Sequence, residues 1–584
     1  MNNLKTVEVP VLIVGGGPAG LTTSLLLSQY GINNLLINKY RWTANSPRAH
    51  ITNQRTMEVF RDAQIEEQVK EVATPRELMA NNIWATSFAG DEIARLLSWG
   101  NAIERKADYE QSSPSSMCNI AQHVMEPVIA NAALRAGSSM RFNNEFLDFS
   151  QDAEGVTARI LDHITGEEYL VRAKYMIGAD GARSKIVDQL ELPLSGQHGL
   201  GCAVNVWLKA DLTEYCAHRP GVLYWIVQPG SDYWVGSGTF ICVKPWKEWV
   251  MTYMYDPAEG EPDLSVEAIT KRAYKVIGDK NVPIEIISTS KWQINRVVAD
   301  RYSKGRVFCM GDAVHRHPPA NGLGSNTSVQ DAFNLAWKIA LVLKGQAGEG
   351  LLETYQQERQ PVGVQLVDRA MRSVENMLPI ANALGFKSGQ SKEEGQAALD
   401  LIFGESPESH IRRAELHKAI ELQHYQFNCN GVQIGQRYQS KAVIPDVRPE
   451  PKFEKDKELY YQPTTWSGAR LPHVWLHDKR GRQLSSLDLC GRGSFTLLTG
   501  HGGDLWKQAV EEISTQIKCP IKVVKIGLGL EYADTFGDWE SIRDIDENGC
   551  ILVRPDHHIS LRVQTPDANP AQQLLNVMKT ILDV

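Results

Sequence analysis

The chain opens on two apolar runs separated by a helical pattern. Residues 9–17 are an apolar run that ends in glycines, residues 18–30 carry helical spacing, and residues 34–38 form a second apolar run. Pro18 falls in the first turn of the helix, where the missing backbone N–H would have no partner anyway. This order predicts a βαβ unit with parallel strands.

Two later segments also show a regular pattern. Residues 200–298 alternate aromatic and aliphatic side chains, which predicts an antiparallel sheet with one face covered. Residues 328–343 return to helical spacing. The apolar positions on one face of that predicted helix are Val329, Ala332, Phe333, Ala336, Ala340 and Leu343.

The last part of the chain has the pattern of a separate unit. Residues 446–465 combine prolines with charges, which predicts an interdomain linker. Residues 466–584 alternate short apolar runs with helical patterns, which predicts a small α/β domain. This domain contains no CxxC pair, so we expect no redox work from it and predict that it is dispensable for chemistry but useful for assembly.

Composition narrows the class of protein. The chain has 584 residues and a net charge of −8, which predicts several domains and gives no reason to expect nucleic acid or a membrane as a partner. The first residues lack a signal peptide, and no apolar stretch is long enough to span a bilayer. The nine cysteines form no CxxC pair and no His/Cys cluster has metal-ligand spacing. We therefore expect a cytoplasmic protein without a metal.

A glycine pattern follows the first apolar run. Gly15, Gly17 and Gly20 have the spacing GxGxxG, with Pro18 and Ala19 between the last two glycines. Such a turn lets a pyrophosphate approach the backbone, and the helix that follows offers free N–H groups to that anion. A purely structural strand–helix turn is the alternative.

The second apolar run ends without the acidic residue that usually holds the adenosine ribose of a dinucleotide. Asn38, or its neighbour Lys39, occupies that position. Asn38 can still hydrogen-bond a hydroxyl group, although without charge. A plain turn residue is the alternative interpretation.

Two Gly-Asp motifs follow further along the chain. Residues 178–184 (GADGARS) contain Asp180 after an apolar run, and Gly311-Asp312 follows a second apolar run and leads into the helix at 328. Asp312 could accept a hydrogen bond from a ribitol or ribose hydroxyl. Each motif alone is more often a turn, but the three motifs in this order are far more specific.

Together the three motifs resemble those of the flavoprotein aromatic hydroxylases, which share the p-hydroxybenzoate hydroxylase fold. The segments around residues 38–59, 107–122 and 305–345 resemble the phenol-hydroxylating branch of that family. The resemblance implies an α/β (α+β) fold: a Rossmann-like FAD/NAD(P)-binding domain, an inserted mixed β-sheet substrate domain and a C-terminal thioredoxin-like domain.

The domain boundaries that we expect follow from this resemblance. The FAD-binding domain would take residues 1–75, 100–190 and 299–385, and the substrate domain residues 76–99 and 191–298. A helical connection would follow over 386–445, then the linker over 446–465 and the thioredoxin-like domain over 466–584.

The family resemblance also implies a reaction. NADPH, or NADH in its place, reduces FAD, O2 adds to give a flavin C4a-hydroperoxide, and a phenol is hydroxylated next to its own hydroxyl group. We therefore expect FAD, NADPH and O2 as cofactors and co-substrate, a small-molecule phenol or chlorophenol as substrate, and a homo-oligomer, either a dimer or a tetramer.

The family resemblance also assigns roles to individual residues of this sequence, at the positions that match the motifs of the family. Arg48 and Gln122 match residues that contact the cofactor, although a surface arginine and an exposed glutamine are the alternatives. The loop before the helix at 328 should lie along the flavin ring, where helix N–H groups can stabilise negative charge. The loop residues concerned are Pro319, Gly322, Leu323, Gly324, Ser325 and Asn326.

Two residues are catalytic candidates. His50 could take the phenolic proton, because a histidine titrates near neutral pH. Pro319 would sit at the edge of the flavin where oxygen reacts. For His50 the alternative is a structural histidine that fixes its loop.

The aromatic middle segment would supply the wall of the substrate pocket. The residues that we expect to contact substrate, besides His50 and Pro319, are Trp225, Tyr255 and Trp292. Trp207 and Tyr224 belong to the same segment. Most of these aromatic residues would simply be core, and spacing does not decide between the two roles.

Two other functions stay open at this point. The substrate could be a carboxylated phenol or a polyketide, although an acid would need an arginine that the sequence does not place. The chain could also be a non-catalytic flavin-binding protein, since the fold alone does not fix the function.

Overall fold

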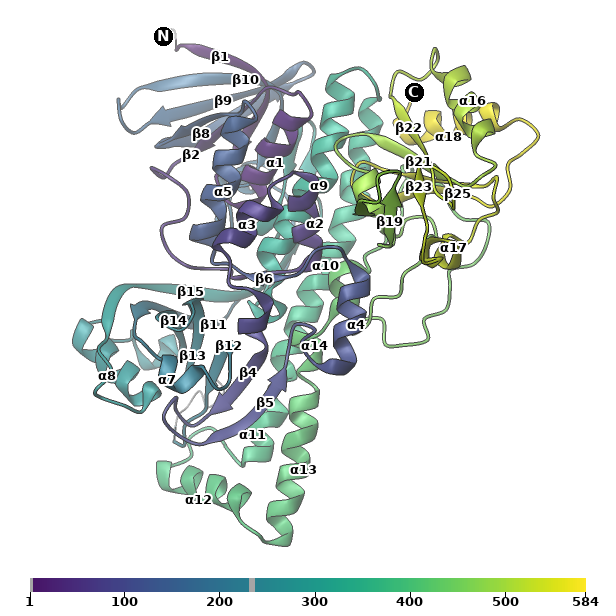
Figure 1. Cartoon of the computed structure of the whole chain (residues 1–584). Helices are drawn as coiled ribbons and strands as arrows, with labels where there is room; N and C mark the ends of the chain where they lie inside the picture. The colour runs from purple at the N-terminus through teal and green to yellow at the C-terminus, as the bar shows by residue number, and fades with distance from the viewer. Residues whose placement is uncertain (1–3, 231–236) are drawn as a thin grey trace.

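The computed structural model describes residues 4–230 and 237–584, and Figure 1 shows its arrangement. Residues 1–3 and 231–236, which fall in the expected FAD-binding and substrate domains, lie outside the described residues. The first sheet runs in the order β16-β17-β10-β1-β2-β7, and β9 and β8 extend it from β10. Its strands are β1 (Thr6–Val14), β2 (Asn34–Asn38), β7 (Ser139–Phe142), β8 (Asn144–Asp152), β9 (Gly155–Asp162), β10 (Glu168–Gly178), β16 (Ser303–Lys304) and β17 (Val307–Cys309).

The register of the parallel strands brings their carboxyl ends together. Val14 of β1 pairs with Gly178 of β10, Gly178 pairs with Cys309 of β17, and Ile37 of β2 pairs with Val14. The predicted βαβ unit is confirmed, with β1 starting at Thr6. The segments that follow these strands therefore meet at one edge of the sheet.

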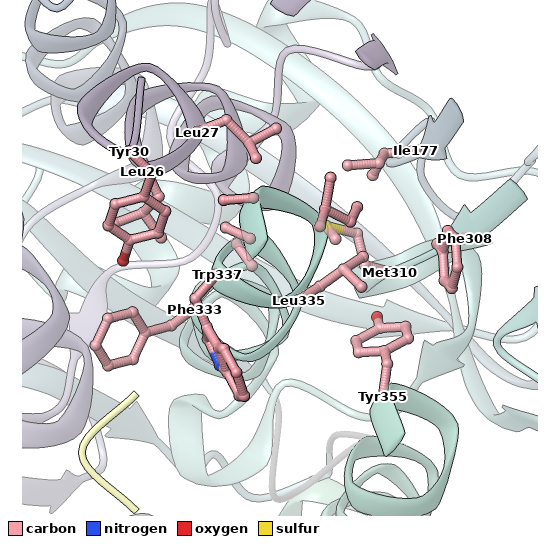
Figure 2. Packing of buried hydrophobic residues seen from close by; sticks show 14 of the residues in the cluster. Leu26, Leu27, Tyr30, Ile177, Phe308, Met310, Phe333, Leu335, Trp337 and Tyr355 are labelled. Carbon is pink, nitrogen blue, oxygen red and sulfur yellow. The ribbon is translucent and has the colours of Figure 1, made fainter. Parts of the chain in front are cut away.

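Three helices pack beside this sheet (Figure 1). They are α1 (Pro18–Gln29), α5 (Gln122–Arg135) and α9 (Gly324–Leu343). The helix predicted over 328–343 is confirmed but begins four residues earlier and is buried on every side from Asn326 to Leu341. Figure 2 shows why: the α9 side chains lie between Leu26 and Leu27 of α1 and Tyr355 of α10 (Glu353–Glu375). A helix enclosed by its neighbours has no solvent-facing polar stripe.

The second sheet is the one predicted over 200–298, with two further strands from the region before residue 100 and one from residues 315–316. Its order is β18-β15-β11-β14-β13-β12-β4-β5. The strands are β4 (Asn81–Ala85), β5 (Glu92–Leu97), β11 (Leu194–Lys209), β12 (Gly221–Ile226), β13 (Gly238–Lys244), β14 (Glu248–Tyr255), β15 (Glu285–Ala299) and β18 (His315–Arg316).

The two faces of the second sheet have different neighbours. Helix α8 (Val266–Ile277) covers one face, where Arg272 lies 4.0 Å from the centre of the Tyr253 ring. The other face turns toward the start of α5: Val243, Val250 and Ala121 form one buried apolar cluster there. This second face is called the inner face below.

The C-terminal unit is built on two small sheets. One is mixed, in the order β22-β21-β24-β25, and the other runs β20-β19-β23. The strands are β19 (Trp475–Asp478), β20 (Gln483–Ser485), β21 (Phe495–Thr499), β22 (Ile521–Lys525), β23 (Tyr532–Ala533), β24 (Cys550–Val553) and β25 (Ile559–Val563). Helices α16 (Asp504–Ile513), α17 (Asp538–Arg543) and α18 (Pro570–Leu582) complete this unit, and residues 446–465 before it form no helix or strand.

The remaining elements connect these units. A two-stranded sheet pairs β3 (Ile51–Thr52) with β6 (Cys118–Asn119). The other helices are α2 (Gln54–Asp62), α3 (Glu66–Val72), α4 (Ile103–Ser112), α6 (Lys185–Leu190), α7 (Thr213–Cys216), α10 (Glu353–Glu375), α11 (Leu378–Leu384), α12 (Lys392–Phe403), α13 (Pro407–Glu421), α14 (His424–Phe427) and α15 (Asn430–Ile434).

Buried ion pairs fasten the C-terminal unit to the first. Glu58 of α2 pairs with Arg470, and Glu358 of α10 pairs with Arg554, all four side chains being nearly inaccessible. Burial alone would raise the pKa of Glu58, but the charges of Arg470 and Arg55 outweigh it and hold that pKa at about 2. These buried charge pairs therefore hold the C-terminal unit in place, and removal of the unit would take away the two arginines.

These contacts argue against a dispensable C-terminal unit. We expect a chain ending at residue 445 to deprive Glu58 of Arg470 and Glu358 of Arg554, which leaves each carboxylate with one cation, Arg55 or Lys338, and so destabilises the remaining protein and leads to aggregation. Size-exclusion chromatography of the truncated chain tests this expectation. A monodisperse, folded product would contradict it.

Replacing one partner of the interface pair should cost more than replacing both. We expect Arg470→Met to lower the apparent melting temperature, because the buried Glu58 then keeps only Arg55 of its two arginines, and breaking a buried ion pair costs up to about 3–5 kcal/mol. The double variant Glu58→Gln, Arg470→Met should recover much of the loss. Thermal unfolding of both variants measures the difference, and equal melting temperatures would contradict a paired charge at this interface.

Candidate functional site

The turn after β1 holds the predicted fingerprint glycines, and each has a distinct environment. Gly15 has φ +114°, and a Cβ on it would collide with the carbonyl oxygen of Ala179. A Cβ on Gly20 would collide with the carbonyl oxygen of Gly15. At Gly17, by contrast, no atom lies within 4 Å of where a Cβ would stand. Gly15 and Gly20 thus serve packing, whereas Gly17 borders open space.

The amino end of α1 faces that open space. Gly17 is its N-cap and has no side chain to cap it, Pro18 takes the first helical position, and the first turn carries no acidic residue. Ala19, next in the turn, is buried in the core shared with the sheet. Free N–H groups without a competing carboxylate are the donors that a pyrophosphate needs. The residues present therefore fit the phosphates of FAD.

The end of β2 lies next to this turn. The Asn38 amide nitrogen donates to the carbonyl oxygen of Trp42 (3.0 Å), and a Cβ on Gly16 would come within 2.9 Å of the same nitrogen. Asn38 is buried, so its side chain supports the glycine turn. Lys39 is exposed, with its ammonium group 5.1 Å from the centre of the Tyr40 ring.

The two Gly-Asp motifs differ in what their aspartates do. Asp180 accepts a hydrogen bond from the Ser184 hydroxyl (2.6 Å), and burial raises the pKa of its carboxyl group. Asp312 is exposed, and its carboxylate has no hydrogen-bond partner among the described residues. Asp312 is therefore the aspartate that remains available to a ribityl or ribose hydroxyl.

A buried charge network holds the second motif in place. The backbone N–H of Gly311 donates to Asp331 of α9 (3.1 Å). Asp331 also accepts from His315 (2.8 Å) and from Arg359 of α10 (2.7 Å). Because Asp331 is fully buried, this arrangement fixes the turn at Gly311 against two helices.

The predicted flavin loop ends at the amino end of α9. Leu323 is the N-cap of that helix without a side-chain cap, and no acidic residue lies in its first turn, which includes Gly324 and Ser325. Gly322 has φ +63° and lies against Ile51, the residue after His50. Free N–H groups at this position suit the negative charge of a reduced flavin.

The same loop is tied to the His50 segment. Asn326 donates from its amide nitrogen to the Ile51 carbonyl oxygen (2.8 Å) and accepts from the Asn53 backbone N–H (2.9 Å). Pro319 is exposed at the start of the loop. The structure thus brings the loop and the His50 segment together, as the family resemblance implies.

Helix α5 organises the segment that carries Arg48. Gln122 donates to Glu126 (2.6 Å), and Glu126 accepts from the Ala44 backbone N–H (2.6 Å). Burial raises the pKa of the Glu126 carboxyl group, while these hydrogen bonds and Arg48 oppose the rise. Arg48 itself is exposed and forms no ion pair with a described residue, so it is available to a ligand.

His50 forms one hydrogen bond, and that bond settles its tautomer. Its Nδ1 lies 2.6 Å from the side-chain oxygen of Asn119. The Asn119 amide nitrogen donates to the Cys242 carbonyl oxygen (3.1 Å), so the other Asn119 atom is the oxygen and accepts. The proton of neutral His50 therefore sits on Nδ1, which leaves the lone pair on Nε2 without a protein partner.

Burial also sets the charge of His50. Desolvation lowers its pKa to about 4, against the opposing effect of the hydrogen bond with Asn119. His50 is thus neutral at neutral pH and presents Nε2 as a hydrogen-bond acceptor. Asn119 escaped sequence reasoning because only the pairing of β3 with β6 brings it beside His50.

The predicted substrate residues do not all lie on the same face of the second sheet. Trp225 pairs across β12 and β13 with Thr239, and Trp292 donates to Asn205 (2.9 Å), which places both tryptophans on this face. Tyr255 pairs with Cys202 and therefore lies on the opposite, α8-covered side.

Trp207 and Tyr224 divide in the same way. Trp207 is on the inner face, 5.3 Å from His123 between ring centres, whereas Tyr224 packs 5.0 Å from Phe88 in the core. We therefore no longer expect Tyr255 to contact substrate, because strand alternation turns its side chain away from the residues around His50.

Phe427 links the inner face to the flavin loop and was not predicted from the sequence. Its ring centre lies 6.3 Å from that of Trp225. The amide nitrogen of Asn321, in the flavin loop, donates to the carbonyl oxygen of Tyr425, two residues before Phe427 (2.7 Å). Contacts thus connect His50 to the flavin loop, and the flavin loop to Trp225 through the segment that carries Phe427. His50 is also connected to β13, through Asn119.

The described residues contain neither a cluster of metal ligands nor a helix that could span a membrane. No group of three or more His, Cys, Asp or Glu side chains in residues 4–230 and 237–584 could hold a metal ion. In the same residues, no helix is both long and apolar enough to cross a membrane.

Comparisons with known proteins agree on one family. A family described as FAD binding domain matches residues 8–370, and one described as aromatic-ring hydroxylase, C-terminal, matches residues 464–584. The chain is 46% identical to 2,4-dichlorophenol 6-monooxygenase of Delftia acidovorans over all of both chains. It is 43% identical to phenol 2-monooxygenase of Pseudomonas sp. (strain EST1001), over 99% of this chain and 93% of that one.

A solved structure shares the whole fold. The flavin-dependent monooxygenase PieE, solved in complex with FAD and substrate, superposes with a TM-score of 0.95 at 46% identity, over 99% of each chain. The fold class and the family expected from the motifs are therefore confirmed.

Gly17 offers the sharpest test of the cofactor site. Because a side chain there enters open space, we expect Gly17→Val to fold normally but to purify without FAD. The matched variant Gly20→Val should fail to fold, because its Cβ collides with the Gly15 carbonyl. Flavin absorbance per protein and circular dichroism measure the two effects. A Gly17→Val protein with full flavin would contradict the site.

Proposed function

Because the chain belongs to the family of FAD-dependent aromatic-ring hydroxylases, we propose that it hydroxylates a phenol next to the hydroxyl group. The chain is a flavoprotein monooxygenase, with FAD as cofactor, a nicotinamide cofactor as reductant and O2 as co-substrate. We propose NADPH as that reductant, with NADH as the alternative, and a simple or chlorinated phenol as the substrate. Degradation of such phenols would be its role.

The observation that carries this proposal is the free Nε2 of His50. Oxygen transfer to the ring is electrophilic, so it is helped by removal of the proton from the phenol. Asn119 fixes the His50 tautomer with Nε2 open, and the flavin loop lies next to His50 through Ile51. A phenol hydroxyl that donates to Nε2 would lie beside the expected flavin position.

The low pKa of His50 decides when the proton moves. A base with a pKa of about 4 is too weak to ionise a resting phenol. During oxygen transfer the ring loses electron density and the phenol becomes strongly acidic. We therefore place proton transfer to Nε2 in the transition state, where a weak, neutral base is sufficient. FAD, when bound and reduced, supplies the activated oxygen.

Charge on the inner face favours an uncharged phenol over a carboxylated one. Two central rows of side chains cross this face, and neither contains Lys or Arg. The rows are Trp225, Thr239, Thr252, Asn205 and Ser290, and Leu223, Ile241, Val250, Trp207 and Ser288. A buried carboxylate without a cationic partner would be costly.

Several further expectations stay proposals. We propose that Arg48, Gln122 and Asp312 contact the cofactor, that Pro319 borders the reacting edge of the flavin, and that Trp225 and Trp292 line the substrate site. The domain boundaries given above, a thioredoxin-like relationship of residues 466–584, a dimer or tetramer and a cytoplasmic location are proposed as well. All nine cysteines are free and buried, which supports a reducing compartment.

Phenol-stimulated oxidation of the nicotinamide cofactor tests the function directly. Purified protein is mixed with FAD, O2, a panel of phenols and either NADPH or NADH, and products are identified by mass spectrometry. We expect products one oxygen heavier, with two adjacent hydroxyl groups. A flavin-binding protein without turnover would show no phenol-dependent rate, and a plain reductase would leave the phenol unchanged.

His50→Ala should separate a base from a structural histidine. A positioned general base contributes roughly 10²–10⁴-fold, and we expect a loss of about 100-fold with FAD binding retained. High pH should partly rescue the variant, because the phenol then ionises unaided. The more acidic chlorophenols should suffer least. Product formation across phenols of rising acidity measures this, and equal losses across the series would leave His50 only a structural role.

Asn119→Asp should move the pH dependence. In the wild type the base form of His50 is present above pH about 4 and is lost as the pH falls through that value. A carboxylate beside Nδ1 stabilises the imidazolium and raises the pKa of His50. We expect the acidic limb of kcat/KM to shift to higher pH in Asn119→Asp, and the shift to vanish in a double variant with His50→Ala. An unmoved limb would contradict coupling between the two residues.

A further inference from the structure

The inner face of the second sheet carries a side-chain amide that is only half used. Asn205 of β11 is half-buried, and its side-chain oxygen accepts hydrogen bonds from Trp292 Nε1 (2.9 Å) and from the Thr252 hydroxyl (2.9 Å). Among the described residues, none accepts a hydrogen bond from the Asn205 amide nitrogen. Two N–H donors are therefore left over.

The two donors to Asn205 fix which way its amide points. An indole N–H can only donate, so the atom facing Trp292 is the oxygen and not the nitrogen. A flipped amide would place two donors against each other. The NH2 group of Asn205 is thus held away from Trp292 in a set direction.

A second tryptophan–asparagine pair on the same sheet differs in that its asparagine uses both ends of the side-chain amide. Trp225 Nε1 donates to the side-chain oxygen of Asn82 (3.3 Å), and the Asn82 nitrogen donates to the Ser98 hydroxyl (2.7 Å). Asn82 is completely buried with both ends satisfied, as a structural amide should be. Asn205 keeps its nitrogen free where Asn82 does not.

The position of Asn205 relates it to His50. Asn119, the partner of His50, binds the backbone of β13 at Cys242, and Asn205 lies two strands further on, across β14. Neighbouring strands are ~4.8 Å apart, so the two strands are separated by roughly 10 Å. Cys242 lies in the row of Trp249 and Leu208, and Asn205 is three residues along β11 from Leu208, which adds roughly 10 Å along the strand. A phenol bonded at one end to His50 and at the other to Asn205 would lie in the space between Asn205 and the Asn119 contact at Cys242, which are roughly 14 Å apart.

From this geometry we propose that Asn205 determines specificity by donating a hydrogen bond to an ether or carbonyl oxygen opposite the hydroxyl of the phenol. The inference rests on the proposed function, which it extends to the far end of the substrate. Trp292 and Thr252 are positioning residues, because they act on the substrate only through the orientation of Asn205.

The test compares two phenols of similar shape and acidity, 4-methoxyphenol and 4-ethylphenol, which differ in one acceptor oxygen. The measured quantity is the ratio of their KM values with the FAD-loaded enzyme, with Kd values from the flavin absorbance change as a second readout. The wild type should prefer 4-methoxyphenol. A lost neutral hydrogen bond should reduce this preference roughly three- to tenfold.

Two variants keep the test independent of folding. Asn205→Leu removes the donors but also strands the Trp292 N–H, whereas Asn205→Asp keeps an acceptor for Trp292 and Thr252 and removes only the donors. We expect both to lose the preference. The matched control Asn281→Leu, at an exposed asparagine in the turn before β15, should keep it.

The outcomes are distinct. Absence of hydroxylation of both phenols by the wild type would overturn the proposed function. Hydroxylation with the same ratio of KM values in wild type and both Asn205 variants would overturn the role of Asn205 alone and leave that residue as the support of Trp292.

Discussion

The register of the parallel strands is the constraint on which the whole site depends. Val14, Gly178 and Cys309 lie side by side at the ends of β1, β10 and β17, so three motifs separated by up to about 300 residues open at one edge. The last residues of each strand are buried on both faces of the sheet, which makes slippage costly. The uncapped amino ends of α1 and α9 face the space that these turns leave.

The chemistry depends on a second, shorter chain of contacts. β3 and β6 place Asn119 beside His50, Asn119 reaches the second sheet at Cys242, and Asn326 ties the start of α9 to Ile51. One hydrogen-bonded path thus connects the expected flavin loop, the candidate base and the second sheet. The C-terminal unit adds to this rigidity, because Arg470 holds α2, the helix that follows the His50 segment.

Sequence reasoning reached the features that are encoded locally. Glycines at fixed spacing, Pro18 at a helix start and apolar runs all act within a few residues, and the fold built from them is confirmed. Sequence reasoning did not identify Asn119 or Phe427, because only contacts between segments that are far apart in the sequence bring them to the site. Alternation assigned Tyr255 to a strand but could not say which face meets the flavin. The pair of Glu58 and Arg470, 412 residues apart, looks like two surface charges in the sequence.

The position of a bound phenol tests the central claim most directly. In a crystal structure of the FAD complex with a slowly reacting phenol, the phenol oxygen should lie about 2.6–3.2 Å from Nε2 of His50. His50 Nδ1 should remain bonded to Asn119, and the ring should lie between the flavin loop and the inner face of the second sheet. A phenol hydroxyl directed away from His50, with Nε2 bonded to a protein atom, would contradict the account.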